Sequence, residues 1–229
     1  MSNLNNKKTS VEELTFRLLT RQIITPHFRW PYSVDDCIRL LTAAYIAQVQ
    51  ARGGAYNEFG ATENIRRVAQ TLHDLKGVKR GFILCGDCGN GKTTMMRAVA
   101  SATAYMQDEA GMFFLKIKGN EPFKLDVHFS FIDAMDAAYA DREGVKATAE
   151  KAILVIEDMG QEPLEVQSYG NIYNPVIDIL EKRYENASPT FITTNLDPRQ
   201  LGQRYGKRIQ DRLREMMYTI AFDNPSYRR

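Results

Sequence analysis

A glycine-rich segment carries the clearest chemical signal in the sequence. It reads Gly86-Asp87-Cys88-Gly89-Asn90-Gly91-Lys92-Thr93. This spacing follows the pattern G-x-x-x-x-G-K-[ST], in which glycines let backbone amides surround phosphate oxygens. Lys92 would place its charge on the β- and γ-phosphates of a nucleotide, and the Thr93 hydroxyl would bind Mg²⁺. Thr94 extends the polar start of the next helix. Taken together, these residues predict ATP and Mg²⁺ as ligands.

The flanks of this segment agree with a phosphate-binding loop. An apolar run, Phe82-Ile83-Leu84, predicts a strand before the loop, and a helix is expected to open at Lys92. The free N–H groups and the dipole of that helix would attract an anion. The alternative is a chance glycine-rich turn, which the strand and helix on either side disfavour.

Cys85 and Cys88 overlap the loop in a C-x-x-C spacing that could indicate zinc or a redox dithiol. Zinc needs further ligands, and the histidines are scattered at His27, His73 and His128. We therefore expect the spacing to be coincidental. The remaining cysteine is Cys37, and an odd count of three does not build a disulfide framework, so a reducing cytoplasm is the expected location.

Polar residues follow two further apolar runs. Glu157 and Asp158 follow Ile153–Ile156, where one carboxylate could hold Mg²⁺ and the other could orient a water molecule. Asn195 follows the run at 191–194 and could reach the γ-phosphate. The alternatives are a pair of exposed acids at a strand end and an ordinary asparagine turn.

Short apolar runs alternate with amphipathic stretches from residue 81 onward. Strands are expected at 81–86, 123–131, 152–159, 190–196 and 217–222, and helices at 92–107, 133–143 and 174–186. Strands that alternate with helices indicate a parallel sheet covered on both sides. The predicted fold class is therefore α/β.

The first third of the chain predicts helices instead. The signals are N-capping residues and glycine stops: Ser10 with Glu13, then Ser33, Gly53-Gly54, Thr62 and Gly77. The aromatic group Phe28, Trp30 and Tyr32 could stack on bases, although a core or partner-facing cluster is favoured.

Arginines recur near the C-terminus at a helical spacing. On one continuous helix, Arg204, Arg208 and Arg212 would form a stripe, and an apolar face would lie beside it. Such a stripe suits phosphate recognition, either on ATP across a subunit interface or on a nucleic-acid backbone. The alternative is a solvated amphipathic helix in which Asp211 partly neutralises Lys207.

These motifs in this order resemble the AAA+ ATPases of the DnaC/IstB-like group. The resemblance covers residues 56–229 and rests on the loop at 86–93, VIEDMG at 155–160, TTNLDPRQLGQRYGKRIQDRL at 193–213 and NPSYRR at the C-terminus. It implies a P-loop NTPase core that is AAA+-like. Because few residues follow Arg212, we expect no large helical lid. Residues 1–55 would form a small helical N-terminal extension that docks a partner.

The same resemblance implies roles for single residues. The segment 86–93 matches the Walker A loop, Glu157 and Asp158 the Walker B pair, and Asn195 the sensor-1 residue. Arg212 matches the arginine finger, and Arg208 is a neighbouring arginine that could serve the same nucleotide. Such a finger acts in trans, so the resemblance implies a homo-oligomer.

One departure concerns the two acids. The family usually has Asp where Glu157 stands, and many AAA+ proteins have Glu where Asp158 stands. Because placement errors near 1 Å can cost about 10²-fold in rate, hydrolysis is expected to be slow or partner-dependent.

The resemblance implies work on DNA with a replicative helicase or a transposase as partner, as a helicase loader or a transposition helper. Two other functions stay open: a nucleotide-dependent adaptor that hardly hydrolyses ATP, and a small-molecule P-loop kinase.

A net charge of +2 gives no overall attraction to nucleic acid, and no apolar run is long enough to span a membrane. Phe59 is a candidate for the adenine pocket.

Overall fold

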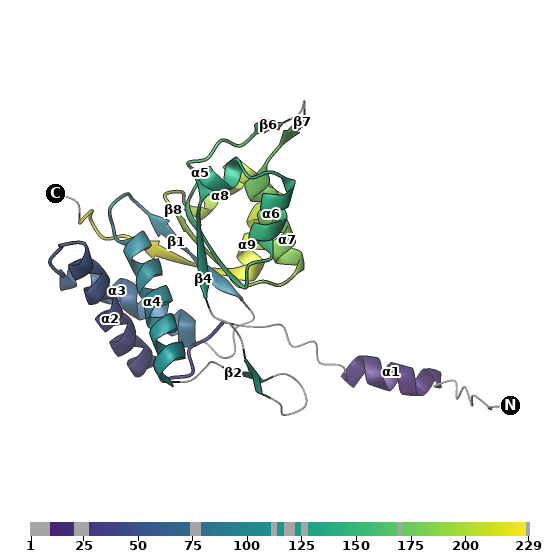
Figure 1. Cartoon of the computed structure of the whole chain (residues 1–229), viewed down its shortest axis with the longest axis horizontal. Coiled ribbons are helices and arrows are strands. Elements are labelled where there is room, and N and C mark those ends of the chain that lie inside the picture. The colour runs from purple at the N-terminus through teal and green to yellow at the C-terminus, as the bar shows by residue number, and fades with distance from the viewer. Residues whose placement is uncertain are drawn as a thin grey trace.

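A five-stranded parallel sheet forms the centre of the protein (Figure 1). The computed structural model describes residues 10–20, 28–73, 79–110, 114–116, 122–124, 128–168 and 171–227. The strand order is β4-β5-β8-β1-β9. Their bounds are Phe129–Asp133 for β4, Ile153–Met159 for β5, Thr190–Thr194 for β8, Gly81–Gly86 for β1 and Met217–Phe222 for β9.

All neighbouring strands of this sheet run in the same direction, so their carboxyl ends share one edge. The first four residues of β5 and all of β8 are buried, as expected for strands covered on both faces. The loop after β1 and the polar ends of β5 and β8 therefore meet at this edge. In open α/β sheets, this edge is where ligands bind.

One face of the sheet is covered by α2, α3 and α4, with bounds Val34–Ala51, Glu58–His73 and Lys92–Ala110 (Figure 1). Phe28 and Trp30 are buried in the same apolar cluster, where Phe28 packs edge-on against Phe129 and Phe191. The indole N–H of Trp30 donates to the hydroxyl of Thr103 at 3.0 Å. These two aromatic residues are thus core residues, as the packing interpretation expected.

The other face is covered by five helices: α5 Ala134–Ala138, α6 Arg142–Ala149, α7 Pro175–Glu185, α8 Pro198–Tyr205 and α9 Lys207–Met216. Their apolar residues form a second buried cluster with β5 and β8. In α9 the buried residues are Ile209, Leu213 and Met216, which confirms the predicted apolar face.

Gly206 separates α8 from α9, so the expected continuous arginine stripe is wrong. The residue has a φ of 84°, which glycine adopts without steric cost and which ends a helix. Arg204 lies before this break and donates to the carbonyl of Glu162. Only Arg208 and Arg212 share a helix.

Three other expectations about elements are corrected. Residues 123–131 do not form one strand, because β3 (Pro122–Lys124) pairs with β2 (Phe114–Lys116) in a separate hairpin. The helix expected at 133–143 is divided between α5 and α6, because Asp141 caps a new helix. Thr62 is not an N-cap: α3 already begins at Glu58, and the Thr62 hydroxyl donates to its carbonyl.

The helix starts at Ser10 and Ser33 are confirmed. The Ser10 hydroxyl accepts from the Glu13 amide at 3.2 Å before α1 (Val11–Thr20), and the Ser33 side chain caps α2. Gly77, His27 and the side chain of Phe59 lie outside the described residues. A further hairpin, β6 (Val166–Ser168) with β7 (Asn171–Tyr173), was not predicted. Within the described parts of the chain, no helix is long and apolar enough to cross a membrane.

Candidate nucleotide-binding site

The loop between β1 and α4 has a backbone shape that favours glycine at Gly86, Gly89 and Gly91, and at two of these a Cβ atom would also clash with other segments. Gly86 and Gly91 have φ values of 145° and 95°. A Cβ atom at Gly86 would lie 2.3 Å from the carbonyl oxygen of Phe222, and one at Gly91 would lie 2.5 Å from the hydroxyl of Tyr45. The glycines thus let the loop pass close to other segments, in a conformation that side chains resist.

Lys92 lies at the mouth of this loop with 5% of its surface exposed. Its ammonium group donates to the carbonyl oxygens of Gly86 at 2.6 Å and Asp87 at 2.8 Å. It also donates to the side-chain oxygens of Asn90 at 3.2 Å and Asn195 at 3.0 Å. The predicted Walker A lysine and sensor-1 asparagine are therefore in direct contact.

All four of these acceptors are neutral, so none of the hydrogen-bond partners of the Lys92 ammonium group carries a negative charge. Burial lowers the pKa of Lys92, and this outweighs the nearby acidic groups, including Asp158 and Asp87, which raise it. A phosphate at the loop would supply the missing negative charge at short range. The site is therefore favourable for an anion.

The loop is also held by the end of β9. The side-chain amide of Asn90, which is 1% exposed, donates to the carbonyl of Phe222 at 2.8 Å. Cys88 is a free, exposed thiol whose sulfur accepts from the Asn195 amide at 3.5 Å, whereas Cys85 and Cys37 are free and buried. Among the described residues, no group of three or more potential metal ligands forms a metal cluster.

The first turn of α4 carries the two threonines of the prediction. Thr93 is half-buried directly after Lys92, at the helix N-terminus where unpaired N–H groups face the loop. The hydroxyl of Thr94 accepts from the Arg52 guanidinium at 3.0 Å, which links α4 to the end of α2. The sequence did not indicate this arginine.

A β-bulge interrupts β5 at its two acidic residues. The register with β8 moves from Ile156 opposite Ile192 to Met159 opposite Thr194, so β5 has one extra residue at this point. Asp158 has a φ of 53°, and its amide donates to the Thr193 hydroxyl at 3.0 Å. The irregular backbone lies where the metal-side and water-side acids were predicted.

Glu157 is paired with Arg97 of α4 at 2.9 Å, and only 12% of the glutamate side chain is exposed. Burial raises the pKa of Glu157, and the attraction of Arg97 opposes this rise. Its second oxygen, Oε1, is buried and has no hydrogen-bond partner among the described residues. Asp133 lies opposite Glu157 in the register of β4 and β5.

The unpaired oxygen fits a magnesium site. A buried carboxylate oxygen without a partner is costly unless a cation or water binds it. Thr93, Glu157 and Asp158 stay the predicted ligands that would hold Mg²⁺ together with nucleotide phosphates.

Arg208 and Arg212 of α9 belong to a separate cluster around Glu181 of α7. The same carboxylate oxygen of Glu181 lies 3.1 Å from Arg208 and 2.9 Å from Arg212. The Arg212 guanidinium also lies over the ring of Tyr184, 4.9 Å from its centroid. Arg212 is 19% exposed and Arg208 70% exposed, so the two differ in how far they are embedded.

A parallel sheet with a strand–loop–helix segment after β1, and with two acids on β5 on the far side of β8, decides the fold. It is a P-loop NTPase fold. No family model and no curated protein sequence matches the chain.

The chain is similar to several solved structures. DnaI is 21% identical with a TM-score of 0.47, over 76% of this chain and 85% of that one. The DnaC helicase loader is 21% identical with a TM-score of 0.46, over 71% and 88%. AMPPCP-bound DnaA from Aquifex aeolicus is 15% identical with a TM-score of 0.45, over 72% of this chain and 48% of that one.

Sequence reasoning missed several residues that contact the predicted site. They are Arg52, Arg97, Thr193, Glu181 and Asn224. Arg97 could have been found, because it lies four residues after Thr93 and shares its helix face. The others come from distant segments, and no local pattern marks them.

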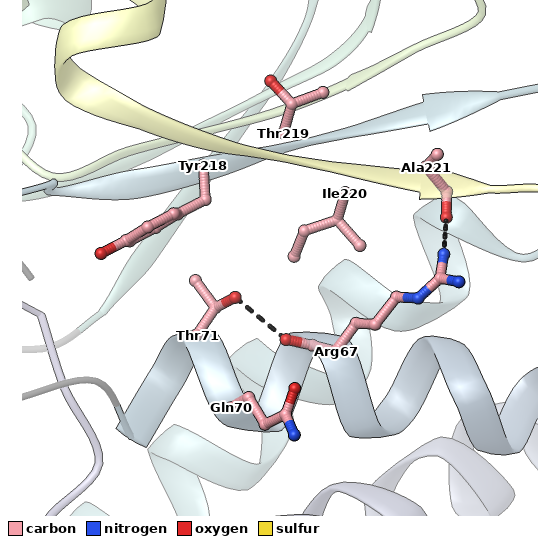
Figure 2. A pocket seen from close by; sticks show the side chains of 7 residues that line it. All are labelled: Arg67, Gln70, Thr71, Tyr218, Thr219, Ile220 and Ala221. Atoms are coloured by element: carbon pink, nitrogen blue, oxygen red, sulfur yellow. Dashed lines mark hydrogen bonds between the residues drawn. The ribbon is translucent and has the colours of Figure 1, made fainter.

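A surface hollow of about 600 Å³ lies away from these groups, between α3 and β9 (Figure 2). Its lining residues are Arg67, Gln70, Thr71, Tyr218, Thr219, Ile220 and Ala221. None of the predicted site residues lines it. The hollow runs beside β9, which is one of the two edge strands of the sheet.

Proposed function

We propose that this P-loop NTPase binds Mg·ATP and hydrolyses it slowly as an AAA+-like ATPase. The supporting observation is the position of Lys92, a nearly buried ammonium group held at the loop mouth by neutral oxygens only. A triphosphate would replace some of these acceptors with charged ones. Charge-assisted hydrogen bonds are about twice as strong as neutral ones.

The chain's own residues would divide the chemistry between them. Loop amides and Lys92 would bind the β- and γ-phosphates, and Asn195, already bonded to Lys92, would orient the γ-phosphate or the attacking water. Mg²⁺, held by Thr93 and the two acids, would neutralise charge on the phosphates. Water would attack the γ-phosphorus, the bond to the β-phosphate oxygen would break, and Asp158 would accept a proton from the water.

Arg212, or Arg208 beside it, would complete the site of a neighbouring subunit in a homo-oligomer. As the motif resemblance implies, the oligomer would act on DNA and recruit or remodel a helicase or transposase. Residues 1–55 would bind that partner, and residues 56–229 would form the ATPase domain. In the N-terminal part, the side chains of Val11, Leu14 and Phe16 are exposed, which suits protein contact.

Calorimetry of Mg·ATP binding to the wild type and to Lys92→Ala tests the nucleotide site. We expect binding by the wild type and a loss of about 100-fold or more in the variant, because charged hydrogen bonds to phosphate are removed. Lys207→Ala, on the exposed start of α9, is the matched control. No heat with the wild type at millimolar Mg·ATP would refute the proposal.

A second candidate is a nucleotide switch that binds ATP and scarcely hydrolyses it. The observation that favours it is the pair between Glu157 and Arg97, since a carboxylate already bound to arginine is less available for catalysis. Single-turnover hydrolysis with and without DNA separates the two. ATP-dependent retention of a partner without any hydrolysis would select the switch.

A pull-down with ATP would identify the partner class. A hexameric helicase retained by the wild type and lost with Lys92→Ala would select the loader role. A transposase with the same dependence would select the helper role.

A further inference from the structure

The segment 223–227, here called the tail, lies against the phosphate-binding loop. The amide of Tyr227 donates to the carbonyl of Gly89 at 2.9 Å. The side-chain amide of Asn224 donates to the carbonyl of Asn90 at 3.2 Å. Two successive carbonyl groups of the loop are therefore bonded to residues more than one hundred positions away along the chain.

Asn224 is itself held by α3. Its side-chain oxygen accepts from the amide of Asn64 at 2.7 Å, and Asn64 is 4% exposed. Gly60 of α3 leaves room for the tail, because a Cβ atom there would lie 2.5 Å from the Cβ atom of Asn224. The tail thus bridges α3 and the loop through buried polar groups.

The end of β9 that leads into the tail is fixed to α3 as well. Figure 2 shows the guanidinium of Arg67 reaching from α3 to the carbonyl of Ala221, at 3.0 Å. The same side chain lies 3.6 Å from the carboxylate of Asp223. The path of the tail from β9 across the loop is therefore defined on both sides.

Aromatic rings close the other side of the loop. A Cβ atom at Gly91 would lie 3.2 Å from the ring of Tyr227 and 2.5 Å from the hydroxyl of Tyr45. The Tyr45 ring packs edge-on against Tyr56, with centroids 6.3 Å apart. The backbone at Gly91 is thus enclosed by side chains from α2 and the tail.

These carbonyl contacts fix the direction of the amides that would bind phosphate. In a planar trans peptide, the C=O and the following N–H point in opposite directions. Because the carbonyls of Gly89 and Asn90 point toward the tail, the amides of Asn90 and Gly91 point away from it. Amides that already face the ligand do not have to reorient when an anion binds.

We infer that the tail is part of the nucleotide site, and that Asn224 is a positioning residue that orients the loop amides for phosphate. This inference rests on the proposed function, because it concerns the affinity of the same loop. The tail does not touch phosphate in this scheme. It acts through the backbone of Gly89 and Asn90.

The test measures binding of Mg·ATP and of inorganic tripolyphosphate by calorimetry. Asn224→Ala removes the bonds to both Asn90 and Asn64, and we expect about tenfold weaker binding, as for the loss of one to two hydrogen bonds. The loss should be equal for both ligands, since the tail acts on the phosphate loop and not on the base. Asn64→Ala, which keeps the bond to the loop, should cause about a threefold loss.

Asn174→Ala is the matched control. Asn174 caps α7, where its side-chain oxygen accepts from the Ile177 amide, so its removal should lower the thermal midpoint by a comparable amount. Its nucleotide affinity should stay within twofold of the wild type. Thermal unfolding without nucleotide is recorded for all variants.

Three results would overturn the inference. They are unchanged affinity in Asn224→Ala, a loss for Mg·ATP but not for tripolyphosphate, and an equal loss in Asn174→Ala. If the wild type binds neither ligand, the proposed function fails and this inference fails with it. If the wild type binds and only the Asn224→Ala result disagrees, the proposed function stands.

Discussion

Two cationic sites of the described residues, one at Lys92 and one at Arg208 with Arg212, are balanced in different ways. At the sheet edge, Lys92 is surrounded by neutral oxygens from the loop and from Asn195. On the opposite helical layer, Arg208 and Arg212 share the carboxylate of Glu181. The first site lacks a bound negative charge, whereas the second already contains one.

This difference shows which site is prepared for a phosphate and which must rearrange. A phosphate at Lys92 would supply a negative charge that the hydrogen-bond partners of the ammonium group do not provide. An anion at Arg212 would have to compete with Glu181 and with the ring of Tyr184. If Arg212 is the proposed finger, it would reach a neighbouring subunit only after it leaves Glu181 and Tyr184.

The largest expected effect concerns the arginine cluster. Arg212→Ala should lower steady-state ATP hydrolysis by about 10³-fold, as when an arginine finger is removed, and should leave ATP affinity nearly unchanged. Phosphate release at saturating ATP measures it, with Arg214→Ala as the control on the same helix. If Arg212 acts in trans, mixing this variant with Lys92→Ala should restore activity. Full activity of a dilute monomeric Arg212→Ala would point to a kinase-like site instead.

The next effect concerns the loop backbone. Gly91→Ala should weaken Mg·ATP binding by about 10- to 100-fold, because the new methyl group meets the Tyr45 hydroxyl at 2.5 Å and the φ of 95° disfavours alanine. Combining it with Tyr45→Phe should recover only part of the loss, since the backbone strain remains. Calorimetry on Gly91→Ala, Tyr45→Phe and the double variant gives the coupling free energy between the two positions in nucleotide binding. Additive losses would show that the contact is unimportant.

A smaller effect is expected at the residue that holds both arginines. Glu181→Gln should raise oligomer-dependent hydrolysis about two- to fivefold, because partly exposed ion pairs contribute about 0.2–1 kcal/mol. The gain should shrink at high salt, where the wild-type pair is screened. Hydrolysis at several protein and salt concentrations measures it. A decrease would mean that Glu181 positions the arginines for catalysis.

The smallest expected effect is on the thermal stability of the folded protein, and it concerns Glu157 at the sheet edge. The raised pKa of Glu157 means that the folded protein disfavours the ionised carboxylate, so stability is lost as pH rises above the ordinary value of 4.5. Glu157→Gln should therefore raise the thermal midpoint at pH 7, with a smaller difference from the wild type near pH 4. Thermal unfolding without nucleotide measures it. A lower midpoint at pH 7 would show that the Arg97 pair outweighs burial.

Much of this architecture could be predicted from the sequence, because the signals are local. The apolar runs at 81–86 and 190–196 correspond to β1 and β8, and the glycine pattern marks the loop. Contact between Lys92 and Asn195 also follows, since parallel strands place their carboxyl ends together. The roles of the predicted site residues stay predictions.

What could not be predicted depends on long-range contacts or on single backbone angles. Gly206 could be read as a tolerated glycine within a helix, but its φ of 84° divides the arginine stripe. The partners of Arg97 and Asn224 lie 60 and 134 residues away in the chain. No periodicity or capping rule gives pairs at such separations.

The direct junction between α9 and β9 has a mechanical consequence. The helix ends at Met216 and the strand begins at Met217, so no flexible linker separates them. Six residues of strand, about 20 Å long, then lead to Phe222, whose carbonyl holds Asn90 of the loop. If α9 contacts a neighbouring subunit, as proposed, a displacement of α9 would be transmitted through β9 to the phosphate-binding loop of the same subunit. Nucleotide occupancy of adjacent subunits would then be coupled.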